Sequence, residues 1–107
     1  MTDKELIELA AKAIGVCDHG EWFDSDDGQY FVVGSKLFDP LNDDGDALRL
    51  AVSLGLIVDI DTEEHYTEIE FTSNYEDKSA SEGHGFDATE ATRRAITRAA
   101  AQIGKEM

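Results

Sequence analysis

Acidic residues gathered around glycines are the first feature of this sequence that could do chemistry. Residues 39–46 read DPLNDDGD, and Ca²⁺ prefers oxygen ligands such as carboxylates. An EF-type loop needs an oxygen ligand at its first position and glycine at its sixth. Gly45 at the sixth position places Pro40 at the first, and Gly28 at the sixth places Phe23 there, so both tests fail. We therefore expect residues 39–46 to cap a helix, because Asp and Asn accept hydrogen bonds from its free N–H groups.

Sulfur and imidazole groups form the second set of potentially reactive residues. Cys17 and His19, with His65 or His84, could bind a metal, and Cys17 beside a histidine could act as a nucleophile. Their spacing matches no standard zinc pattern, and no nucleophile elbow, phosphate-binding glycine loop or dinucleotide fingerprint occurs. The sequence therefore predicts no catalytic residue, cofactor or metal site, and a small metal protein or enzyme using Cys17, His19 and His84 is the weakest alternative.

The strongest signal in the composition is negative charge. Twenty-four Asp and Glu face nine Lys and Arg, which gives a net charge of −15. A field of this sign repels nucleic acid and anionic membranes and attracts cationic surfaces. We therefore expect a protein partner that is basic or DNA-binding, and no direct contact with nucleic acid or membrane. Solubility alone is the competing explanation of the acidity.

The candidate contact residues lie between positions 66 and 82. Residues 66–72 alternate, so that in a strand Thr67 and Ile69 point one way while Glu68 and Glu70 point the other. Carboxylates spaced along a strand and the adjoining loop could imitate a phosphate backbone. The predicted protein-binding residues are Tyr66, Glu68, Glu70, Glu76, Asp77 and Glu82.

Positive charge gathers near the C-terminus. Residues 87–107 contain only three of the 24 acids but four of the nine bases. Arg93, Arg94 and Arg98 form the main basic cluster. A solvated helix face is the main expectation for them, and pairing with Glu90, with acidic faces of this chain or with a second copy is the alternative.

The elements that must position these groups follow from the hydrophobic pattern. Apolar residues at helical spacing predict helices over 3–14, 46–54 and 87–103, and capping residues precede each. Glycines at positions 15, 55 and 104 are expected to end them. Two strand pairs, 20–23 with 29–33 and 56–61 with 66–72, lie between the helices. Residues 73–85 show no apolar period and are expected to form a mobile loop.

These elements predict one α+β domain over residues 1–107. The order is α-ββ-α-ββ-α, with three helices packed on an antiparallel sheet of about four strands, or alternatively an α/β/α sandwich. Alanines dominate the apolar face of the last helix, so that its backbone can lie close to a neighbouring element. The single cysteine excludes an internal disulfide and fits a reducing cytoplasm, and no stretch is apolar enough to cross a membrane.

Three stretches resemble a known family. Residues 1–13 (MTDKELIELAAKA), 38–52 (FDPLNDDGDALRLAV) and 88–104 (ATEATRRAITRAAAQIG) are similar to small phage and prophage proteins with a phage ABA-sandwich domain. The resemblance implies a helix–sheet–helix layering and a bacterial or viral origin. With the single cysteine, it leads us to expect a location in the cytoplasm of a bacterial host. It implies no established activity.

The sequence therefore favours a non-enzymatic phage or prophage accessory protein. Its expected role is to bind a host protein through an acidic surface, as a DNA mimic or inhibitor. The main alternative is a structural domain that forms a homodimer through its alanine-rich last helix or a sheet edge.

Overall fold

The computed structural model describes residues 1–15, 20–26, 28–34 and 36–107. Its elements are, in chain order, α1 (Asp3–Ala13), β1 (Gly20–Ser25), β2 (Gly28–Val33), β3 (Lys36–Leu37), α2 (Asp44–Leu54), β4 (Ile57–Asp61), β5 (Tyr66–Ser73), β6 (Glu76–Gly83) and α3 (Ala88–Lys105). Within these described residues, no helix combines the length and apolarity that crossing a membrane requires.

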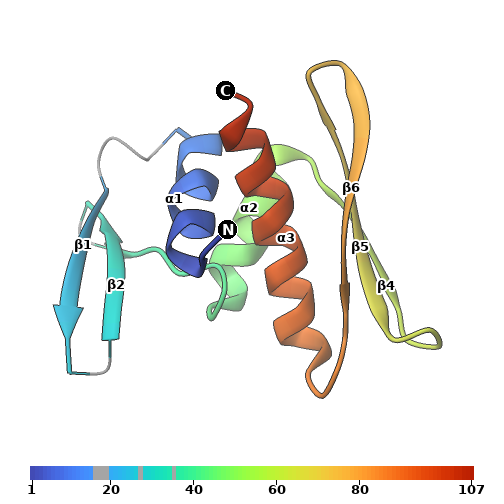
Figure 1. Ribbon diagram of the computed structural model, residues 1–107, viewed down its shortest axis with the longest axis horizontal. Coiled ribbons are helices and arrows are strands. Elements are labelled where there is room, and N and C mark those ends of the chain that lie inside the picture. The colour runs from blue at the N-terminus through green and yellow to red at the C-terminus, as the bar shows by residue number, and fades with distance from the viewer. Residues whose placement is uncertain (16–19, 27, 35) are drawn as a thin grey trace.

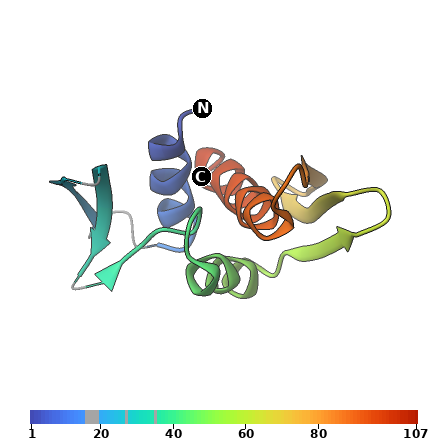
Figure 2. The same ribbon diagram turned by 90° about the horizontal axis from the view of Figure 1, so that it is seen from below.

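The three helices form the middle layer of the molecule. Figure 1 shows β1 and β2 on one side of α1, and β4–β6 on the far side of α3. Figure 2, turned by a right angle, shows the same order of layers, with α2 below α3. The predicted packing of helices on sheets is confirmed, but the layers run sheet–helices–sheet. The expected α/β/α order, with a sheet between helices, is therefore wrong.

The strands form two separate antiparallel sheets instead of one sheet of about four strands. Among the described residues, β1, β2 and β3 make one sheet and β4, β5 and β6 make the other. The element order is accordingly α-βββ-α-βββ-α. The β1–β3 sheet lies beside α1 and the β4–β6 sheet beside α3, so the helices separate the two sheets.

The predicted mobile loop at 73–85 is mostly a strand. β6 pairs with β5 at eight successive positions, from Ser73 opposite Glu76 to Tyr66 opposite Gly83. The turn between them is Asn74-Tyr75, and both residues have φ near +60°, at 53° and 64°. Two consecutive positive φ angles define the type I′ turn that suits a two-residue hairpin. The ladder to β5 therefore holds a polar segment that has no hydrophobic pattern of its own.

Side-chain caps start all three helices, as the sequence predicts. Thr2 accepts a hydrogen bond from the Glu5 N–H, and Asp43 accepts one from the Asp46 N–H. Asp87 accepts from the N–H groups of Thr89 and Glu90. At the other end of α2, Gly55 adopts the left-handed conformation expected of a C-terminal glycine.

Gly104 does not end α3, contrary to expectation. The helix continues to Lys105, and a Cβ at Gly104 would lie 2.0 Å from the carbonyl oxygen of Leu9 in α1. Glycine is required there because the two helix backbones touch. Ala95, Ala99 and Ala100 are also fully buried, and their small side chains allow neighbouring elements to lie close to α3. The alanine face therefore packs inside the molecule and is not free to form a dimer.

Candidate protein-binding surface

The face of β5 that points away from α3 carries the predicted contact residues. Along this strand Thr67, Ile69 and Phe71 are buried, whereas Glu70 is exposed and Glu68 partly exposed. The predicted alternation is confirmed. Figure 1 shows why it arises, because α3 covers one face of the sheet and no helix or strand of the described residues covers the other.

The sheet register brings three further carboxylates beside Glu68 and Glu70. In an antiparallel pair, residues directly opposite each other project from the same face. Asp59 of β4 lies opposite Glu68, and Asp61 lies opposite Tyr66. Asp77 of β6 lies opposite Thr72, whose hydroxyl donates a hydrogen bond to it. We call the face with Asp59, Asp61, Glu68, Glu70 and Asp77 the acidic face.

No cation balances this charge on the described strands. The other positions of the acidic face are Ile57 on β4, Tyr66 and Thr72 on β5, and Ser79, Ser81 and Gly83 on β6. The only base on these strands is Lys78, which lies opposite the buried Phe71 and binds Glu106 of α3. The five carboxylates therefore form a surface of one sign.

Tyr66 reports the potential of the acidic face. The negative charge of Asp61 raises the pKa of the Tyr66 phenol above its ordinary value of 10.0, and burial, Glu68 and Asp59 act in the same direction. The cause is repulsion between the negative phenolate and the neighbouring carboxylates, which favours the neutral phenol.

Two of the predicted contact residues do not belong to this face. Glu82 points toward α3, where its Oε1 lies 3.0 Å from an Arg98 guanidinium nitrogen. Glu76 has the same strand parity as Glu82 and lies at the hairpin end, opposite Ser73. Sequence reasoning missed Asp59 and Asp61. Their alternation with Val58 and Ile60 was a usable signal, once β4 was known to pair with β5 in this register.

The arginines of α3 connect this helix to its neighbours. The Arg93 guanidinium donates to the Leu41 carbonyl and to Asp44, at 2.8 and 2.7 Å. Arg94 donates to both carboxylate oxygens of Asp3, and the resulting hydrogen bond raises its own pKa. These arginines pair with acidic groups of this chain, so the main expectation of a solvated helix face is wrong and the alternative is confirmed.

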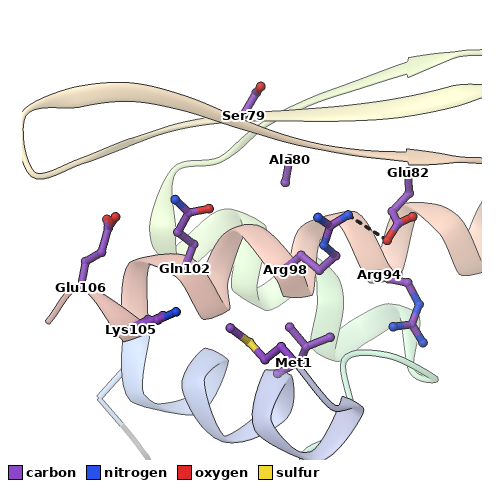
Figure 3. A pocket seen from close by; sticks show the side chains of 10 residues that line it. Met1, Ser79, Ala80, Glu82, Arg94, Arg98, Gln102, Lys105 and Glu106 are labelled. Carbon is purple, nitrogen blue, oxygen red and sulfur yellow. Dashed lines mark hydrogen bonds and ion pairs between the residues drawn. The ribbon is translucent and has the colours of Figure 1, made fainter.

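A cleft of about 740 Å³ lies between α3, β6 and the start of α1. Arg94, Arg98 and Lys105 project into it from α3, and Figure 3 shows Arg98 bonded to Glu82 across it while Ser79 points away. Arg98 also donates to the Ser81 carbonyl at 3.0 Å. Two of the three cations are thus paired with acids of this chain. These ion pairs connect α3 to β6 and to the start of α1, and the cleft does not present an open anion site.

The remaining reactive residues do not assemble into a site in the described structure. Cys17 and His19 lie outside the described residues. His84 is buried, and its Nε2 lies 2.8 Å from the hydroxyl of Thr67, which also contacts Thr92. Thr92 donates to the Ala88 carbonyl, so the Thr67 proton goes to Thr92 and His84 donates through Nε2. Among the described residues, no three metal-ligating side chains cluster.

The acidic segment at 39–46 caps a helix, as expected. Asp43 accepts the Asp46 N–H at 2.8 Å, and Asp46 accepts the Asp39 N–H at 2.9 Å while it pairs with Arg49. These carboxylates are therefore engaged with the backbone and with arginine.

Comparison with protein-family models, with curated protein sequences and with solved structures finds no match to this chain. The resemblance to phage ABA-sandwich proteins therefore rests on the sequence motifs alone.

Proposed function

We propose that this chain is a non-enzymatic accessory protein that binds a basic protein through the acidic face. The observation that supports the proposal most is the collection of five carboxylates on one open sheet surface, without a cation at the other described positions. Opposite charge on the partner would relieve their mutual repulsion, which gives binding a driving force and a fast encounter.

The placement of the positive charge strengthens this proposal. Five of the nine Lys and Arg residues form ion pairs with acids of the chain: Arg49, Lys78, Arg93, Arg94 and Arg98. None of these pairs involves a carboxylate of the acidic face. A protein that needed negative charge only for solubility would have no reason to leave one sheet face without cations.

The partner class that fits best is a protein that itself binds nucleic acid. Glu68 and Glu70 are two residues apart on β5, and a strand rises about 3.3 Å per residue, so their charges lie about 6.6 Å apart. Closely spaced negative charge is the feature that basic nucleic-acid-binding surfaces recognise. In the phage context that the sequence motifs indicate, such an occupant would be inhibited by competition with DNA.

The test is an affinity capture from bacterial lysate at low and at moderate salt, identified by mass spectrometry. The decisive comparison is between Glu68→Gln/Glu70→Gln and Glu21→Gln/Asp26→Asn. The second pair lies at exposed positions of the β1–β2 hairpin and removes the same charge. We expect a basic protein that duplex DNA displaces and that only the first pair of substitutions releases. Equal capture by both variants would refute the assignment of the acidic face.

A further inference from the structure

A mostly apolar groove of about 440 Å³ lies between α2 and β4, with α3 as its floor. Its main lining residues are Leu48, Ala51, Val58, Ile60, Thr92 and Ile96. Leu48 and Ile60 are 63% and 50% exposed although both are large and hydrophobic. Figure 2 shows the reason, because α3 lies over β5 and β6 while α2 stands apart from β4.

The same strand presents an unpaired edge. β4 is hydrogen-bonded to β5 along one side, and no described strand pairs with its other side. Alternate N–H and C=O groups of Ile57–Asp61 therefore point away from the sheet, where they can accept another strand. Val58 and Ile60 line the groove, whereas Asp59 and Asp61 belong to the acidic face.

From these features we infer that the partner adds a strand to β4 in which apolar and basic residues alternate. Its apolar side chains enter the groove beside Val58 and Ile60. Its Lys or Arg side chains project from the opposite face, next to Asp59 and Asp61. Strand addition of this kind takes affinity from main-chain hydrogen bonds and specificity from alternate side chains. This inference rests on the proposed function, because it names the segment by which the basic partner binds.

Electrostatic repulsion argues against a second copy of this chain as the occupant of the groove and the β4 edge. Pairing β4 with its own copy would bring Asp59 and Asp61 beside identical carboxylates, and each copy carries a net charge of −15. Like charges across strands are destabilising. A basic helix in the groove would meet the apolar residues, but it would leave the β4 edge unpaired and would not extend the acidic face.

The first experiment uses the whole protein and a synthetic nine-residue peptide in which lysine and valine alternate. A peptide of the same composition with its valines in one block is the control. We expect the alternating peptide to bind more tightly, and its binding to slow hydrogen exchange at the β4 amides that do not face β5. Binding without this protection would overturn strand addition while leaving the acidic face as the binding surface.

Substitutions then separate the groove from the charge. Val58→Thr/Ile60→Thr keeps β-branched residues at exposed positions of β4, so the fold should persist, which a thermal unfolding curve checks. We expect a loss of affinity of about tenfold or more, since two apolar contacts disappear. Glu68→Gln/Glu70→Gln should instead flatten the salt dependence. Unchanged affinity in the threonine variant would overturn the inference alone.

Two further outcomes are informative. If neither the alternating peptide nor an arginine-rich peptide binds, the inference and the proposed function fail together. If the protein without peptide forms a dimer in sedimentation and its outward β4 amides are already protected, the groove belongs to a second copy and the inference is wrong.

Discussion

The two sheets of this protein have the same strand order but opposite surface chemistry. The β1–β3 sheet turns Trp22 and Phe31 toward the helices, and its exposed side carries Phe23 stacked on Tyr30, with ring centroids 5.8 Å apart. The β4–β6 sheet buries Ile69, Phe71 and Thr67, and its open side is the acidic face. Each sheet buries only the face that packs on the helices, so the composition of its exposed face is not set by packing. The difference between the two exposed faces therefore points to function.

The two sheets are also held to the helices in different ways. Aromatic side chains fill the space between α1 and the first sheet, where Trp22 contacts Phe31, donates to Glu8 and lies under Lys4. Between α3 and the second sheet, alanines allow close approach and Arg98 bonds to β6. Large rings can adjust to a change, whereas the backbones of α1 and α3, which touch at Gly104, cannot.

The largest effect is therefore expected where backbones touch. Gly104→Ala should destabilise the fold by about 3 kcal/mol, although Gly→Ala inside a helix is otherwise favourable, because the new methyl would meet the Leu9 carbonyl. Gly20→Ala meets the Phe31 ring instead, and we expect a loss of about 1–2 kcal/mol. Urea unfolding of the two variants measures which of them loses more stability. A more stable Gly104→Ala protein would contradict the close contact of α1 and α3.

A smaller loss of stability is expected when the hydrogen bonds from Arg93 of α3 to Leu41 and Asp44 are removed. Arg93→Met keeps the aliphatic stem but removes the bonds to the Leu41 carbonyl and to Asp44. We expect a cost of about 1–2 kcal/mol, since a buried carbonyl loses its donor. Arg49→Met is the matched control, because the Arg49 side chain is 73% exposed and its ion pair with Asp46 should contribute little. Equal losses in thermal unfolding would mean that Arg93 does not connect the helices.

Acid should weaken the junction between β6 and the end of α3. Hydrogen bonds from Lys78, and then from Ser73, lower the pKa of Glu106 below its ordinary 4.5. A carboxyl whose pKa is lowered on folding stabilises the native state above that ordinary value, and the contribution disappears as pH falls through the lowered pKa. Wild type should thus exceed Glu106→Gln in stability at pH 6, and the difference should vanish in stronger acid. A gap independent of pH would contradict this.

The smallest effect is expected in the titration of Tyr66. Neutralising Asp61 by Asp61→Asn should lower the phenol pKa toward 10.0, and added salt should do the same. Ring-selective NMR follows the titration, with Tyr66→Phe assigning the signal. The matched substitution Asp26→Asn in the β1–β2 turn should leave it unchanged. A Tyr66 pKa that responds to neither salt nor Asp61→Asn would remove the electrostatic basis of the acidic face.

Much of the fold follows from the sequence because its local signals agree with its tertiary structure. Capping residues and apolar spacing locate the helices, and the alternation along Tyr66–Ser73 correctly divides β5 into two faces. Glu68 and Glu70 of the candidate surface were predicted in this way, whereas Asp77 was named as a residue of the adjoining loop. The ion pairs of the α3 arginines were foreseen only as the alternative to a solvated helix face.

The missing parts depend on partners distant in the sequence. β6 has a single buried apolar residue, Ala80, and exists because every position pairs with β5. The β4–β5 register places Asp59 and Asp61 on the acidic face. Glu82 lies on the opposite face of the sheet, where it pairs with Arg98. Gly104 has the appearance of a helix end until α1 is placed against it. Asp59 and Asp61 alternate with Val58 and Ile60, but the pairing of β6 and the contacts of Glu82 and Gly104 leave no local pattern.

The central claim is that basic ligands bind the acidic face and not the whole anionic molecule. Its most direct test is the affinity of an arginine-rich peptide, measured from low to moderate salt, for Glu68→Lys/Glu70→Lys and for Glu21→Lys/Asp26→Lys. Both variants change the net charge equally and differ only in which sheet carries the change. We predict that the first loses binding and most of its salt dependence while the second stays close to wild type. Equal losses in both variants would contradict the claim.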